Sequence, residues 1–317
     1  MLQMVAEQGL LYGIMALGVF LSFRILAVPD LTVDGSFPLG GAVAATLIAA
    51  GIPALPSTLA AVAAGAAAGG ATGWLHARLR VPALLAGILT MTALFSVNLR
   101  VMGRPNVPLL RLPTLLEDAQ RLGVPSDWAA LVVFAAAATL VVGGLLWWLR
   151  TEMGLALRAA GDNEAMAVSA GVEVGRARTL GLAISNGLVA LSGALAAQYQ
   201  GFADVNMGIG TIVAGLASVI LGEVLVRPRD LAWRLAAAVT GSLAYRAAIA
   251  AALELGLDPG DLKLATAAVV TIALAIPGLA QERLRSRAAV RRAGRGLVRS
   301  LSGHGILSAG HRRPPLS

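Results

Sequence analysis

The side chains best able to do chemistry in this sequence lie inside or beside apolar segments. Four of them follow the first apolar run in quick succession: Asp30, Thr32, Asp34 and Ser36. Polar groups on irregular backbone at membrane depth are tolerated only where they are buried in protein or line a cavity. Two interpretations stay open: the aspartates line a pathway, or Asp34 caps the next helix and Asp30 pairs with Arg24.

Single polar residues also interrupt later apolar runs, at Asn98, Asn186, Gln198, Glu223 and Arg246. Charges in such runs usually face the protein interior or a water path. Arg246 either reaches the membrane boundary, pairs with an acid or contacts a solute. The candidate pathway residues are therefore Asp30, Thr32, Asp34, Asn98, Asn186 and Arg246.

Residues for catalysis, metal binding or nucleotide hydrolysis do not form recognisable patterns. The chain has no cysteine, and its single lysine, Lys263, is outside any G-x-x-x-x-G-K-[ST] sequence. His76, His304 and His311 lack the spacing of a zinc or catalytic motif. The chain is therefore expected not to be an enzyme and to bind no metal or cofactor itself.

The most hydrophilic internal stretch, residues 153–181, separates two strong apolar runs. Asp162 is a suitable N-cap, and Gly171 suits the left-handed position that ends a helix. These signals predict a helix of about two turns over residues 163–170 outside the bilayer, with Ala167 on its apolar face. A helix this short is marginal alone, so it packs either on the chain's own spans or in a partner's socket.

The elements that position these residues are apolar helices. The chain is 57% hydrophobic and 13% charged, whereas soluble domains carry roughly 25% charged residues. The second apolar run is short and meets Gly51 and Pro53, which indicates a broken or re-entrant segment. We predict an all-α polytopic transmembrane bundle of about 8–9 spans from these apolar runs: 9–28, 39–52, 55–75, 84–102, 128–149, 180–200, 208–226, 231–255 and 262–277.

Charge divides the chain into two parts. Residues 1–280 hold 16 basic and 16 acidic side chains, whereas residues 281–317 hold nine arginines and one acid, Glu282. We therefore expect a membrane domain over 1–280 and a basic, flexible tail over 281–317. The positive-inside rule places the tail and the loop at about 150–178 in the cytoplasm, and lipid headgroups explain the basic charge better than nucleic acid does.

One apolar run carries Gly65, Gly69 and Gly73, two overlapping G-x-x-x-G spacings. This stripe lets a neighbouring helix approach closely. We favour packing within the chain over a dimer seam.

Residues in the hydrophilic stretch resemble the cytoplasmic docking loop of branched-chain-amino-acid and ribose type ABC importer permeases. They are Gly154, Arg158, Ala159, Gly161, Asp162, Asn163, Ala167 and Gly171. The segment ILAVPDLTVDGSFPLGGAVAATL, together with residues 84–110, resembles the branch paired with lipoprotein-type binding proteins of uncertain or aromatic-amino-acid specificity. The resemblance covers most of residues 9–280.

This resemblance implies a permease subunit in a bacterial inner membrane, multi-pass and with a cytoplasmic C-terminus. It implies a homodimer that works with separate ABC ATPase subunits, which hold ATP and Mg²⁺, and with an extracytoplasmic substrate-binding protein. Specificity would lie mainly in that binding protein, and the solute would be small, an amino acid for example. The alternative is a stand-alone secondary transporter or channel, for which paired broken helices are expected; one broken segment is visible.

Overall fold

Apolar helices make up most of the computed structural model, which describes residues 2–256, 261, 264, 266–268 and 271. Six helical stretches among these residues are long and apolar enough to cross a membrane. They are α1 (Leu2–Phe20) with the π-helical turn η1 (Leu21–Ile25), α3 (Ala54–Leu79), α4 (Ala83–Met102), α6 (Ser126–Trp148), α9 (Val174–Gln200) and α11 (Leu231–Glu254). The all-α polytopic prediction is confirmed. The predicted run 262–277 and the tail 281–317 lie outside the described residues, apart from five positions in the run, 264, 266–268 and 271.

Two further apolar helices are shorter, α2 (Val33–Ala49) and α10 (Thr211–Val226). The sequence indicated one broken segment, and the described residues contain two short helices. Their first turns lie together, since a side chain added at Gly208 would meet the Asp34 carbonyl oxygen. From there the helices run apart. α2 reaches the antiparallel pair β1 (Asn106–Pro108) and β2 (Phe202–Asp204), and α10 brings Glu223 to Arg24 of η1.

Helix α9 lies at the centre and packs against α1, α2 and α3. The glycine stripe of α3 is the reason that α3 can lie so close. A Cβ at Gly73 would approach the Thr179 Cα to 2.5 Å, and one at Gly65 would approach the Asn186 carbonyl oxygen to the same distance. Gly69 would likewise meet the Leu182 carbonyl oxygen. The expected packing within the chain is confirmed.

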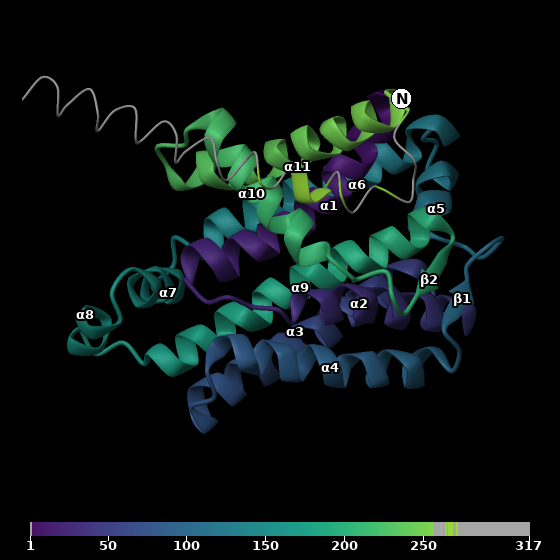
Figure 1. Cartoon of the computed structure of the whole chain (residues 1–317). Coiled ribbons are helices and arrows are strands. Elements are labelled where there is room, and N and C mark those ends of the chain that lie inside the picture. The colour runs from purple at the N-terminus through teal and green to yellow at the C-terminus, as the bar shows by residue number, and fades with distance from the viewer. Residues whose placement is uncertain (1, 257–260, 262–263, 265, 269–270, 272–317) are drawn as a thin grey trace, which may run out of the picture. The chain divides into compact units, whose positions relative to one another are not determined.

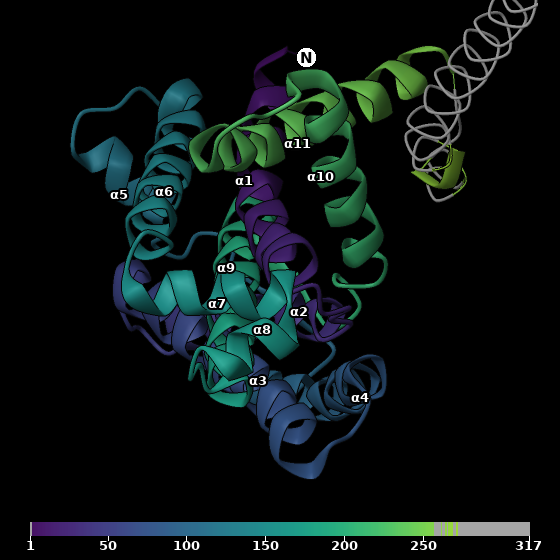
Figure 2. The ribbon, with the colours of Figure 1, turned by 90° about the vertical axis from the view of Figure 1, so that its left-hand side faces the viewer.

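The two ends of the helix bundle carry different elements (Figure 1). Helices α7 (Glu152–Asp162) and α8 (Glu164–Ser169) lie at one end, whereas β1, β2 and α5 (Leu115–Arg121) lie at the other. Figure 2 looks onto the first end and shows α7 and α8 in front of α9. This places the hydrophilic stretch of the sequence outside the apolar helices, as the charge pattern predicts.

Candidate functional site

The segment formed by α7 and α8 is built from two short capped helices. The Thr151 hydroxyl accepts a hydrogen bond from the Gly154 amide at 3.4 Å, and the Asn163 side chain accepts one from the Met166 amide at 3.1 Å. Asn163 is extended, with φ of −155°, and Gly171 has φ of +83°. The left-handed end at Gly171 is confirmed.

The predicted N-cap at Asp162 is wrong by one residue. Asp162 is the last residue of α7, a helix that the sequence did not predict, and Asn163 caps α8. Near this end of α7, Gly161 packs directly on the Ile25 carbonyl, where any side chain would clash. Both Asp and Asn are good caps, so the local sequence does not decide between them. The signal for α7 was Thr151 before the buried positions Gly154, Leu157 and Ala160.

Contacts with the bundle fix the α7–α8 segment in place. Ala167 is 2% exposed and packs with Ala160 and Val174. Arg178 of α9 donates to both carboxylate oxygens of Glu164, at 2.8 and 3.3 Å. Helix α8 therefore contacts α9 through this pair, and α7 contacts η1 through Gly161.

The predicted docking residues differ in exposure. Gly154 and Ala167 are buried, Arg158 and Gly161 are half-buried, and the others are exposed: Ala159, Asp162, Asn163 and Gly171. The segment also exposes large apolar side chains that the sequence analysis did not single out. Met166 is 69% and Val168 58% exposed on α8, and Met153 and Leu155 are more than half exposed on α7. These exposed apolar side chains are available for contact with another surface.

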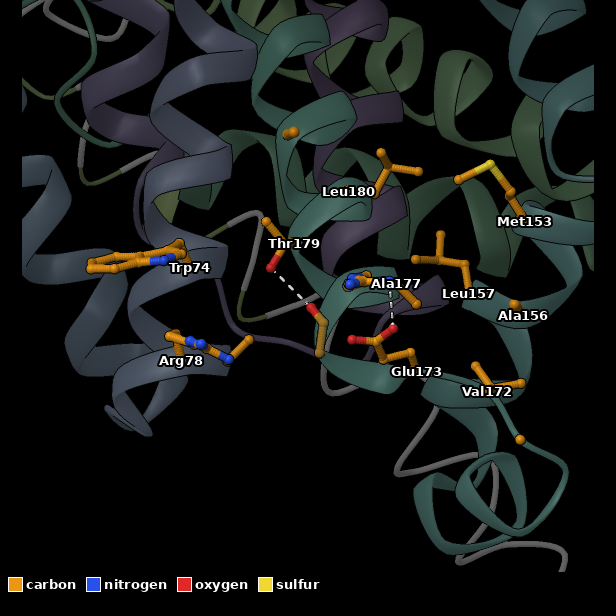
Figure 3. A pocket seen from close by; sticks show the side chains of 15 residues that line it. Trp74, Arg78, Met153, Ala156, Leu157, Val172, Glu173, Ala177, Thr179 and Leu180 are labelled. Atoms are coloured by element: carbon orange, nitrogen blue, oxygen red, sulfur yellow. Dashed lines mark hydrogen bonds and ion pairs between the residues drawn. The ribbon is translucent and has the colours of Figure 1, made fainter.

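An apolar groove of about 870 Å³ lies beside this segment, between the end of α3, α7 and the start of α9 (Figure 3). Trp74 and Arg78 come from α3, and Met153 and Leu157 come from α7. At the start of α9, Glu173 pairs with Arg176 at 2.8 Å. The groove continues the apolar surface of α7 toward the bundle.

A second polar site lies where α2 and α10 begin. The Asp34 carboxylate accepts hydrogen bonds from the Ile212 amide at 2.8 Å, the Gly210 amide at 3.2 Å and the Thr211 hydroxyl at 2.9 Å. Asp34 therefore caps α10 rather than the helix that follows it in sequence. The expectation that Asp34 caps the next helix is wrong, because its carboxylate sits at the free amides of α10.

Asp30, which precedes Asp34 in the sequence, is buried and is hydrogen-bonded to α9. Its carboxylate accepts from the Asn186 side chain at 2.6 Å and from the Thr32 amide at 2.9 Å. The Thr32 hydroxyl lies 2.8 Å from that of Thr72. The expected pair of Asp30 with Arg24 is wrong, because Arg24 forms its ion pair with Glu223.

Asn98 joins this region by donating to the Gly35 carbonyl at 3.3 Å. Among the described residues, the Asn98 and Asn186 Oδ1 atoms and the Ser36 hydroxyl are buried without a hydrogen-bond partner. We call the set Asp30, Thr32, Asp34, Asn98 and Asn186 the central polar cluster. Hydrogen bonds link three of the six predicted pathway residues directly, namely Asp30, Thr32 and Asn186. Asn98 bonds to the α2 backbone and Asp34 to α10.

The sixth predicted pathway residue, Arg246, lies on α11. Its guanidinium stacks 3.6 Å above the Tyr12 ring, and Tyr12 stacks in turn on Phe37 of α2 at 5.8 Å. Arg246 therefore contacts α2 through two aromatic rings rather than through the central polar cluster.

Six membrane-length helices among the described residues define a polytopic membrane protein, with polar side chains buried where its two short helices begin. The chain belongs to the family described as the branched-chain amino acid transport system / permease component, whose profile matches residues 1–275. This is the family that the sequence resembled.

Similar proteins agree with this family. The chain is 41% identical over 276 residues to the tyrosine transport system permease protein of Clostridioides difficile, covering 87% of this chain and 90% of the relative. It is 36% identical over 272 residues to uncharacterized protein RP368 of Rickettsia prowazekii, covering 84% and 94%. It is 30% identical over 226 residues to the ribose import permease protein RbsC of Escherichia coli K12, covering 69% and 67%. No solved structure matches the chain.

The chain is therefore the transmembrane permease component of an ABC-type importer, a non-catalytic component of such transporters. These relatives favour this function over a stand-alone secondary transporter or channel.

Proposed function

We propose that two copies of this chain form the pathway of a bacterial inner-membrane importer with about 8–9 spans in each copy. Separate ABC ATPase subunits, which hold ATP and Mg²⁺, drive alternating access, and an extracytoplasmic binding protein delivers the solute. The solute is a small molecule, an amino acid in this proposal, and an aromatic amino acid is supported by the relative named for tyrosine transport. The end of the bundle with α7 and α8 faces the cytoplasm, as does the C-terminus.

The α7–α8 segment is the proposed docking site for the ATPase. The observation that carries this proposal is the exposure of Met166 and Val168 on a helix that is capped at Asn163 and tied to α9 by the Glu164–Arg178 pair. Apolar side chains presented on a fixed element lose little conformational entropy on binding, which favours a protein partner. The buried Ala167 lies on the side of this helix that packs against Ala160 and Val174.

The central polar cluster is proposed to border the translocation pathway. Asp30 and Asp34 hold the starts of α2 and α10 in place through their hydrogen bonds. The unpaired oxygens of Asn98 and Asn186 are groups that gain a partner when the helices separate or a polar solute passes.

Substitution of the exposed docking residues tests this function. Met166→Asp with Val168→Asp should lower both solute uptake and the stimulation of ATP hydrolysis by loaded binding protein, by about tenfold or more, the loss expected when apolar contacts at the centre of an interface are removed. The assay uses the assembled transporter in vesicles. Leu122→Asp, at the opposite end where Leu122 is 87% exposed, is the control for membrane yield and basal ATP hydrolysis. Normal coupling in the double variant would contradict the docking site.

A further inference from the structure

A second cavity lies on the same end of the bundle as α7 and is lined mainly by arginine. Its volume is about 480 Å³, and its walls come from η1, α10, α11 and the α10–α11 connection. We call it the arginine cavity, and its residues are Arg24, Glu223, Arg227, Pro228 and Arg234. Arg24 precedes Ile25, whose carbonyl contacts Gly161 of α7.

The charges of the arginine cavity do not balance. It holds three guanidinium groups and one carboxylate, and Glu223 pairs with Arg24. Within the described part of the chain, neither Arg227 nor Arg234 belongs to an ion pair. In the same connection, Arg229 and Asp230 offset one another. The cavity therefore has an excess of two positive charges available to an anion.

Apolar side chains beside the cavity indicate the source of that anion. Trp233, 59% exposed, immediately precedes Arg234, and Leu225, 62% exposed, lies two residues before Arg227. Tryptophan is enriched at the boundary between hydrocarbon and headgroups, and arginines just outside that boundary attract anionic lipids. An anion that is attached to acyl chains fits both features.

Backbone geometry fixes where the Arg227 side chain begins. This residue ends α10 in the left-handed conformation, with φ of 47°, and its amide bonds to the Glu223 carbonyl at 3.1 Å. Glycine or asparagine takes this conformation at lower cost. Arg80 ends α3 in the same conformation, so the charges of the cavity, and not this backbone geometry, indicate an anion site.

We propose that the arginine cavity binds the phosphate of an anionic phospholipid. The guanidinium groups of Arg227 and Arg234 donate hydrogen bonds to the phosphate oxygens, for which their planar geometry is well suited. Arg24, fixed by Glu223, adds a third positive charge, and Trp233 and Leu225 contact the acyl chains. This site is independent of the proposed docking of an ATPase.

The test measures retained lipid in the full chain. The protein is placed in nanodiscs of POPC with a minor fraction of POPG, and native mass spectrometry compares the two lipids carried by the released protein. Since each arginine near a membrane surface strengthens anionic-lipid binding about fivefold, Arg227→Asn and Arg234→Gln should each lower POPG retention about fivefold. Asn suits the left-handed backbone at position 227.

Controls separate this site from general surface charge and from free phosphate. Arg121→Gln removes a charge at the opposite end of the bundle and should leave POPG retention unchanged. Equal loss in this control, or unchanged retention in the variant with both Arg227→Asn and Arg234→Gln, would overturn the proposal. Inorganic phosphate added to POPC nanodiscs should not raise the unfolding temperature; a rise equal to that given by POPG would assign a free phosphate site instead.

A measurement on the unsubstituted protein removes any dependence on how the variants fold. Phenylglyoxal modifies accessible arginines, and mass spectrometry reports each position. POPG nanodiscs should protect Arg227 and Arg234 about fivefold or more relative to POPC nanodiscs, the factor expected for one arginine contact. Arg121 should react equally in both. Equal modification of Arg227 and Arg234 in the two lipids would reject a bound headgroup.

Discussion

Replacing Asp34 with alanine should destabilise the protein by removing the cap of α10. The amides of Ile212 and Gly210 would lose their acceptor, whereas the Thr211 hydroxyl would keep the Gly208 carbonyl at 2.9 Å. Leaving a buried donor unpaired costs about 1–3 kcal/mol, so two give about 2–6 kcal/mol. Measured N-cap losses are about 0.5–2 kcal/mol. We therefore expect a loss of about 2–4 kcal/mol in the free energy of unfolding.

Thermal unfolding in nanodiscs measures this effect. In a domain of about 250 residues, 1 kcal/mol shifts Tm by about 2–4 °C, so Asp34→Ala should lower Tm by about 4–16 °C. Asp34→Asn keeps an oxygen for the Ile212 amide and should lose about half as much, since one of the two amide bonds survives. Asp204→Ala is the matched control, because its carboxylate also accepts from a backbone amide, that of Asn206, but in an exposed turn.

The same variants distinguish the two roles that the sequence leaves open for Asp34. A capping role predicts that uptake falls in proportion to the loss of Tm and partly returns in Asp34→Asn. If Asp34→Ala unfolds at the wild-type temperature while uptake is abolished, the capping argument is refuted and the carboxylate acts on the solute.

Three further predictions follow from the packing and the orientation. Gly69→Leu should prevent accumulation of folded protein in membranes, because its side chain meets the Leu182 carbonyl of α9; normal yield would show that α3 and α9 can separate. Because the chain has no cysteine, Ser169→Cys should react with a membrane-impermeant maleimide only from the cytoplasm and Ser126→Cys only from outside, and reversed labelling would invert the topology. Glu164→Gln should lower the free energy of unfolding by less than about 1 kcal/mol, with the difference vanishing at high salt; a larger or salt-independent loss would contradict a solvent-screened pair.

Apolar runs predicted the membrane helices well, because span length and composition follow directly from the bilayer as solvent. The runs 84–102 and 231–255 correspond to α4 and α11 within one residue. The close packing of α3 through its glycine stripe was also predictable, since close helix approach needs small residues at every fourth position. The helix end at Gly171 was predictable because few residues other than glycine adopt the left-handed conformation easily.

Contacts between distant segments could not be predicted. Asp34 caps a helix whose first residue, Thr211, is 177 residues away, and Arg24 pairs with Glu223 rather than with Asp30. The type of a polar side chain predicts what kind of group it binds, a free amide or an opposite charge. Which such group lies within reach depends on the tertiary fold. The same limit explains why α10 was expected as a span rather than as a short helix that begins inside the bundle.

The most direct test of the central claim is a site-specific cross-link from α8 to the ATPase. A photoreactive amino acid replaces Met166 in one variant and Leu122 in another, and the assembled importer is irradiated in membranes. If the ATPase docks on α8, position 166 forms an adduct of this chain with the ATPase subunit and position 122 forms none. No ATPase adduct from position 166, or equal adducts from both positions, would contradict docking through the α7–α8 segment.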